Sequence, residues 1–169
     1  MNFEIKFAEP SDEPFLWEML CEAAHMEGED DQIKIAQQTP GLAQYVAGWG
    51  QKDDVGYIAV DPNTHAMMGA AWFRLFDHQN RGYGYVNDNI PELAIGTVSL
   101  YRGQGVGSTL IKALIDHATG VYAGLSLSVR DSNPAVHLYE RVGFQEVPSS
   151  RTVNRVGGQS FTMALNFSS

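Results

Sequence analysis

The sequence predicts an α/β fold in which helices flank a central mixed sheet, with the element order βααβββαβαββ. An amphipathic helix, Ser108 to Ala118, separates the strand-like segments 92–100 and 125–129, so these two strands are joined by a helical crossover and run parallel. Segments 55–60 and 67–76 are separated only by a short turn with the sequence Asp-Pro-Asn, and form an antiparallel hairpin. A sheet that contains both kinds of pair is mixed.

The first half of the chain supplies further predicted elements. A strand is predicted over Phe3 to Phe7, and Pro10-Ser11-Asp12 caps the helix that follows it. Met26 to Pro40 is an irregular acidic segment, and Leu42 to Trp49 is a second helix that stops at Gly50. After the hairpin, Asp77 to Pro91 forms a loop. The first helix presents one apolar face, composed of Phe15, Leu16, Met19, Leu20, Ala23 and Ala24.

The second half begins with a strand, Glu92 to Leu100, that is apolar at both odd and even positions and is therefore predicted to be central. After the crossover, Asn133 is a good N-cap and Pro134 suits the first turn of a short helix. That helix closes at Gly143, which we expect in the left-handed conformation. A final pair of strands, Gln145 to Asn154 and Gln159 to Asn166, completes the sheet.

Length and composition predict a single domain over residues 1–169, with 44% hydrophobic residues to build its core. A net charge of −9 argues against a nucleic-acid surface. The single cysteine, Cys21, excludes an intrachain disulfide and lies on a predicted core helix, where we expect it to pack rather than react. No apolar signal or membrane-spanning run is found, so the default expectation is a soluble cytoplasmic protein.

The most specific motif is Arg102-Gly103-Gln104-Gly105-Val106-Gly107, which connects a predicted strand to a predicted helix. Glycines let the backbone approach a ligand closely, and the N–H groups and positive dipole end of the helix favour an anion such as a pyrophosphate. The loop lacks the Lys-Ser/Thr ending of an ATP-binding loop. It also misses the dinucleotide fingerprint, because position 108 is serine.

The pattern Arg-x-x-Gly-x-Gly resembles the phosphate loop of the GNAT superfamily of N-acyltransferases, which holds the pyrophosphate of coenzyme A. A second block, residues 133–144 (Asn-Pro-Ala-Val-His-Leu-Tyr-Glu-Arg-Val-Gly-Phe), resembles that family's short helix with a tyrosine and a closing Gly-Phe. The close resemblance covers roughly residues 92 to 147, and both blocks occur in the family's order. It implies the GNAT fold and an N-acetyltransferase that uses acetyl-CoA as co-substrate and no metal.

The resemblance also implies which residues hold acetyl-CoA. The backbone of residues 95–97 would pair with the pantetheine arm, and one of its N–H groups, or that of Val98, would polarise the thioester carbonyl. Arg102 is either an added positive charge or a solvated loop arginine, and Asn133 either contacts the arm or is a plain helix cap. The full predicted set is Ile95, Gly96, Thr97, Arg102, Gly103, Gln104, Gly105, Val106, Gly107, Ser108 and Asn133.

Two residues are predicted to be catalytic. Tyr139 is the candidate general acid for the departing thiolate, since a phenol with a pKa of about 10 stays protonated while a thiol of about 8.5 ionises. The alternative is a core tyrosine. Glu92, at the start of the central strand, is the candidate base that accepts the ammonium proton through water; the alternative is an exposed glutamate at a strand end.

The acceptor is predicted to be an amine, and a cationic one if the carboxylates of residues 27–31 face the cleft rather than form a solvated loop. Five aromatic residues either line the pocket or pack in the core: Trp17, Trp49, Trp72, Tyr83 and Tyr85. His65, His78 and His137 are isolated and expected at the surface, and His25 lies close to the acidic segment. No two histidines have metal-ligand spacing, so no metal is predicted. The sequence leaves open whether the protein forms a homodimer.

Two other functions were weighed. A non-catalytic CoA-binding regulator of the same fold would be suggested by loss of Tyr139 or by a blocked glycine loop, and the sequence shows neither. A nucleotide-binding protein of the Rossmann type would give no reason for the block at residues 133–144.

Overall fold

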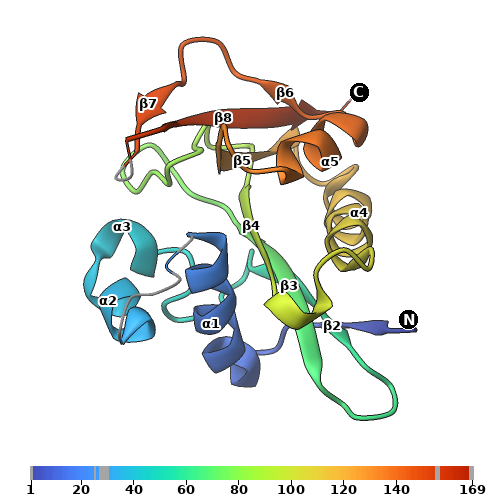
Figure 1. The fold of residues 1–169 in the computed structure, drawn as a ribbon. Helices are drawn as coiled ribbons and strands as arrows, with labels where there is room; N and C mark the ends of the chain where they lie inside the picture. The colour runs from blue at the N-terminus through green and yellow to red at the C-terminus, as the bar shows by residue number, and fades with distance from the viewer. Residues whose placement is uncertain (1, 25, 27–30, 155–156, 168–169) are drawn as a thin grey trace. The chain divides into compact units, whose positions relative to one another are not determined.

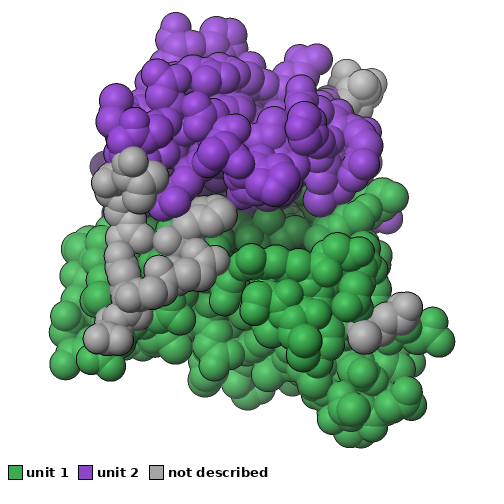
Figure 2. Space-filling view, in the orientation of Figure 1, with its two compact units in different colours: residues 1–74, 94–114 green, residues 75–93, 115–169 purple. Residues whose placement is uncertain are grey.

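The computed structural model describes residues 2–24, 26, 31–154 and 157–167. By their contacts these residues form two compact units (Figure 2), and each unit is described separately. Unit 1 comprises residues 1–74 and 94–114, and unit 2 comprises residues 75–93 and 115–169.

Unit 1 contains the N-terminal strands and helices and the segment that leads into the glycine loop (Figure 1). Its elements are β1 (Glu4–Phe7), the 3₁₀ turn η1 (Pro10–Asp12), α1 (Glu13–Ala23), α2 (Gln32–Gln38), α3 (Pro40–Ala43), β2 (Val55–Val60), β3 (Met67–Arg74), the end of β4 (Glu92–Thr97), the 3₁₀ turn η2 (Ser99–Tyr101) and most of α4 (Val106–Ala118). The strands lie in the order β1-β2-β3-β4, and the β1–β2 and β2–β3 pairs are antiparallel, which confirms the predicted hairpin.

Close packing of α1 against β4 fixes the part of unit 1 that leads to the glycine loop. A Cβ atom at Gly96 would stand 2.5 Å from the carbonyl oxygen of Met19, so glycine is required for this approach. The predicted apolar face of α1 is confirmed at Phe15, Leu16, Met19 and Leu20, all buried. Cys21 is buried in the same helix, as expected for a packing residue.

Unit 2 contains the start of β4, the end of α4 and the C-terminal elements β5 (Gly124–Arg130), α5 (Ala135–Arg141), β6 (Gln145–Glu146), β7 (Thr152–Val153) and β8 (Gln159–Asn166). β4 pairs with β5 in parallel at Glu92 and Ser126, as the crossover predicts. β5, β6 and β7 all pair antiparallel with β8. The predicted mixed sheet flanked by helices is therefore observed.

Several predicted element boundaries were wrong. The irregular segment 26–40 contains α2, and the helix expected over 42–49 begins earlier and ends at Ala43. The strand expected over 92–100 ends at Thr97 and gives way to η2. The strand expected over 145–154 is divided into β6 and β7, because a turn with Ser149 at φ 62° interrupts it.

Candidate functional site

The glycine loop forms an open cradle before α4 in unit 1. Gly103 and Gly105 have φ angles of 79° and 82°, a region that favours glycine, and a Cβ at either would meet no atom within 4 Å. The Thr109 N–H donates to the Gly105 carbonyl at 3.1 Å, so helical hydrogen bonding begins there. The N–H groups of residues 106–108 precede it and, with the positive end of the helix dipole, suit an anion.

The backbone of residues 96–98 lies beside β3 directly before this loop. The Val98 N–H donates to the Met68 carbonyl at 2.9 Å, and the Gly96 carbonyl oxygen would lie 2.9 Å from a Cβ at Gly69. The peptide groups of Gly96 and Val98 therefore face β3, and alternation directs those of Ile95 and Thr97 to the opposite edge. Val98 is engaged by β3, so the suggestion that its N–H polarises a thioester was wrong.

Arg102 forms an ion pair in the structure, and its added charge for cofactor binding stays a prediction. Its Nη2 donates to Glu22 Oε2 at 2.8 Å, with the two side chains 53% and 24% exposed. The arginine is thus held at the entrance of the glycine loop by a carboxylate from α1. Glu22 was not predicted as a site residue, because the sequence carries only a weak signal for it: a glutamate four positions after Glu18 on a predicted helix.

Tyr139 lies on α5 in unit 2 and is 4% exposed, with its ring centroid 6.1 Å from that of Phe144. Burial raises the pKa of its phenol above the ordinary value. Asn133 Oδ1 accepts a hydrogen bond from the Ala135 N–H at 2.9 Å, but the N-cap position of α5 is Pro134 and the helix begins at Ala135, one residue later than predicted. Gly143 ends the helix region with φ 108°, as predicted.

Glu92 is 2% exposed, so the alternative of an exposed glutamate at a strand end was wrong. It pairs in register with Ser126 of β5, which is fully buried. Among the described residues the Ser126 Oγ makes no hydrogen bond. Glu92 is the first residue of β4 and belongs to unit 2. Ile95 and Thr97 lie further along the same strand, in unit 1.

A groove of about 430 Å³ lies between α1 and α2 in unit 1. The described residues that line it include two carboxylates and no positively charged side chain: Glu13, Pro14, Trp17, Glu18, Ile33 and Gln37. The Trp17 Nε1–H donates to Glu13 Oε2 at 3.0 Å, which orients that carboxylate. The chemistry of the groove suits a cation with an aliphatic part.

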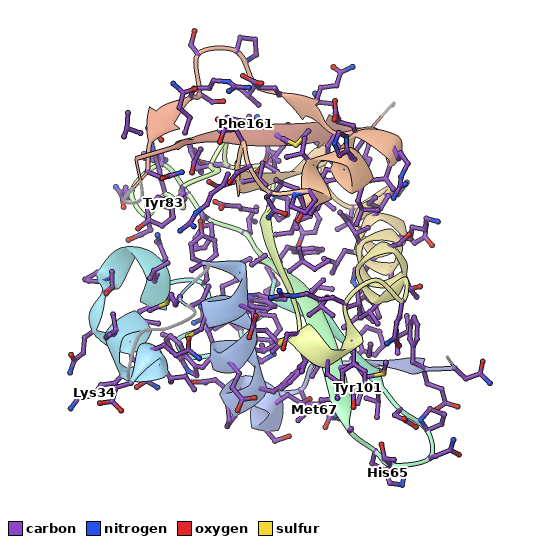
Figure 3. The ribbon with its side chains drawn as sticks, in the orientation of Figure 1. Lys34, His65, Met67, Tyr83, Tyr101 and Phe161 are labelled. Carbon is purple, nitrogen blue, oxygen red and sulfur yellow. The ribbon has the colours of Figure 1, made fainter. Side chains whose placement is uncertain are left out.

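Most of the aromatic candidates pack in the core. Trp49 and Trp72 are buried, and their indole N–H groups donate to the carbonyls of Ala8 and Tyr45. Tyr83 is 63% exposed on the loop between β3 and β4 (Figure 3), and Tyr85 donates a hydrogen bond to Asp88 on the same loop.

The other expectations concern charged groups. His65, His78 and His137 are exposed, as expected, and Figure 3 shows His65 on the turn between β2 and β3. Of the acidic segment and its neighbourhood, His25 and residues 27–30 lie outside the described residues. Within the described ranges, no cluster of His, Cys, Asp and Glu side chains is arranged to hold a metal ion. No described helix has the length and apolar character needed to cross a membrane.

The raised pKa of the buried Tyr139 phenol predicts a pH dependence of stability that can be measured without an activity assay. Above pH 10 the unfolded chain ionises its tyrosines while the folded chain keeps Tyr139 protonated, so the free energy of unfolding should fall by about 1.4 kcal/mol per pH unit from this residue. Below pH 10 the contribution is constant. Urea titrations between pH 8 and about pH 11 should show a shallower decline for Tyr139→Phe than for the wild type; equal slopes would contradict this assignment.

Comparison with known proteins agrees with the fold described above. The profile described as "Acetyltransferase (GNAT) family" matches residues 14–144. The N-alpha-acetyltransferase RimI of Mycobacterium tuberculosis is 39% identical over 70 residues, which are 41% of this chain and 44% of that protein. The matched segment thus spans less than half of that relative.

Two solved structures share the fold over nearly the whole chain. The ribosomal-protein-S18-alanine N-acetyltransferase from Escherichia coli has a TM-score of 0.67 at 22% identity, with coverage of 99% of this chain and 96% of that one. A chimera of spermidine N-acetyltransferase SpeG from Vibrio cholerae and hSSAT has a TM-score of 0.66 at 19% identity, with coverage of 98% and 96%.

The fold and the glycine loop define a GNAT-type acyltransferase architecture, and the family match covers most of the sequence. The chain belongs to the acetyltransferase (GNAT) family.

Proposed function

We propose that this protein is an acetyl-CoA-dependent N-acetyltransferase that transfers an acetyl group to the primary amine of a small molecule or peptide by direct attack in a ternary complex. The observation that carries the proposal is the glycine loop at the N-terminus of α4, where a Cβ at Gly103 or Gly105 would meet no atom within 4 Å. When bound, acetyl-CoA supplies the thioester acyl group.

The cradle fits a pyrophosphate because no side chain fills it. Gly103 and Gly105 leave the space in front of the α4 N-terminus open, and the backbone N–H groups of residues 106–108 would bind phosphate oxygens. The peptide groups of Ile95 and Thr97 would pair with the amides of an extended arm as an added strand does. Gly96 supports this edge indirectly, because it lets α1 pack against β4.

Tyr139 would donate a hydrogen bond to the departing thiolate. Because its pKa is raised, the phenol stays protonated throughout the physiological range. The same shift makes complete proton transfer to a thiolate with a pKa of about 8.5 unfavourable, so hydrogen-bond stabilisation is the larger part of the role.

Glu92 would accept the proton of the attacking ammonium group, through water. Its carboxylate is buried at the start of β4, and a positioned carboxylate can act as a general base. Asn133 would either contact the pantetheine arm or serve only to hold the residues before α5 through Oδ1.

The acceptor would carry a positive charge at neutral pH. The groove between α1 and α2 offers Glu13 and Glu18 to it, and two of the similar structures are named as N-acetyltransferases of ribosomal-protein-S18-alanine and of spermidine. The deciding experiment measures thiol release from acetyl-CoA with a panel of peptides with free amino termini, polyamines and aminoglycosides. Binding of acetyl-CoA without thiol release for any amine would favour the non-catalytic regulator.

Gly105→Val should abolish stabilisation of the fold by acetyl-CoA, because a branched side chain would occupy the cradle. The substitution also strains the backbone by about 1–2 kcal/mol, since φ is positive. Gly120→Val is a matched control, because Gly120 has φ 85° and equally open surroundings but lies after α4, outside the cradle. Thermal shift titrations with acetyl-CoA should separate the two variants. A shift with ATP or NADH but none with acetyl-CoA for the wild type would overturn the cofactor assignment.

A further inference from the structure

The ion pair between Glu22 and Arg102 connects the two parts of unit 1 that the proposed reaction uses. Arg102 immediately precedes the glycine loop, and Glu22 lies on α1, the helix that also lines the acidic groove. The residues are 80 positions apart in the sequence, so the fold brings them together. Their nitrogen and oxygen atoms are 2.8 Å apart.

Glu22 also lies beside the β4 edge. A Cβ at Gly96 would stand 3.3 Å from the Glu22 Cβ, so the glutamate is adjacent to the segment that the proposed function assigns to the pantetheine arm. Glu18 precedes it by four positions, which places both carboxylates on one face of α1. Arg102 therefore neutralises the carboxylate of this acidic face that is nearest to β4.

We propose that Glu22 is an acceptor-binding residue that Arg102 masks until an anion occupies the glycine loop. A bound pyrophosphate offers Arg102 two negatively charged oxygens in the geometry that a guanidinium prefers. The side chains of the pair are partly exposed, and such pairs are weak, so the exchange of partners costs little.

The exchange would leave Glu22 uncompensated, one helical turn from Glu18. Like charges at this spacing repel, and a cation near them relieves the repulsion. An ammonium group of the acceptor would take the place that Arg102 leaves. Cofactor binding would thereby raise the affinity for a cationic acceptor, and by linkage the acceptor would raise the affinity for the cofactor by the same factor.

This inference rests on the proposed function, and its first test uses desulfo-CoA, which lacks the thiol. Isothermal titration at low salt should show binding about two- to fivefold tighter for Glu22→Gln and about two- to fivefold weaker for Arg102→Gln. Glu146→Gln is the matched control, because Glu146 forms a similarly exposed pair with Arg151 elsewhere and should leave the affinity unchanged. Unchanged or weaker binding by Glu22→Gln would overturn the inference while leaving the proposed function intact.

The second test follows the Glu22 carboxylate directly. Carbodiimide coupling to glycine ethyl ester, read by mass spectrometry, should label Glu22 more in the presence of saturating desulfo-CoA, while labelling of Glu146 stays constant. Equal or lower labelling of Glu22 in the complex would show that the anion does not unmask it. If the wild type binds no desulfo-CoA at all, the proposed function fails, and this inference fails with it.

Discussion

Replacing Tyr139 by phenylalanine is expected to lower kcat by about 10²–10³, the range typical of losing one hydrogen-bond donor to a developing negative charge, with little change in the KM for acetyl-CoA. The phenol is buried and stays protonated, so its contribution is one hydrogen bond made as charge develops on the leaving sulfur. The predicted cofactor contacts lie instead on the glycine loop, on the β4 edge and at Asn133. Initial rates at varied acetyl-CoA, with the best amine from the panel, measure both constants.

A tyrosine that is only part of the core would behave differently. Removing its hydroxyl group would alter stability but not turnover, and Tyr45→Phe provides the comparison because Tyr45 is 5% exposed, close to the 4% of Tyr139. Similar kcat values for both variants and the wild type would show that Tyr139 is structural. The activity at pH 9 to about pH 10 is a further check, since the raised pKa predicts no loss from phenol ionisation in that range.

The fold was predictable where the pattern is local. The α1 face, the β2–β3 hairpin and the crossover through α4 each follow from spacing within a short segment. The end of α3 at Ala43, earlier than predicted, does not follow from local spacing. The carbonyls of Gln44, Tyr45 and Ala47 accept hydrogen bonds from Trp72 and Arg74, side chains of β3 about 27 to 30 positions away, so tertiary partners replace the helical ones.

The helix α2 was missed for a related reason. Its sequence, Gln-Ile-Lys-Ile-Ala-Gln-Gln, buries only Ala36, and Asp31 precedes it with a φ of 51° and no side-chain cap. Neither an apolar face nor a capping signal is present, so contact with α1 rather than local preference stabilises it.

The candidate site divides in the same way. The glycine cradle and the capped helix with Tyr139 are local motifs, and each was recognised from consecutive residues. The partner of Arg102 is a glutamate 80 positions away, and no spacing rule identifies it. The burial of Glu92 could not be predicted in the same way, because a glutamate at the first position of a strand gives no indication that its side chain will be only 2% exposed.

Arg74→Met is expected to lower the free energy of unfolding by about 3–5 kcal/mol, the usual cost of breaking a buried ion pair. The side chains of Arg74 and Asp54 are 9% and 7% exposed. Two hydrogen bonds of 3.1 and 2.9 Å join the guanidinium to the carboxylate, and Nη1 donates to the carbonyls of Gln44 and Ala47 at 2.9 and 2.8 Å. The variant leaves a buried carboxylate and two carbonyl groups without this donor. Urea unfolding followed by fluorescence measures the change.

Arg151→Met is the matched control for this prediction. Arg151 also pairs with a carboxylate, that of Glu146 at 2.7 Å, and stacks on an aromatic ring, but its side chain is 44% exposed, so its loss should cost about 1 kcal/mol or less. Adding Asp54→Asn to Arg74→Met should recover part of the stability, because the uncompensated charge is removed while the side chain still accepts the N–H groups of Gly50 and Gln51. Equal losses for Arg74→Met and Arg151→Met would show that the buried pair does not hold the segment after α3 against β3. Since a domain of this kind is stable by only about 5–15 kcal/mol, the expected loss is a large part of what keeps unit 1 folded.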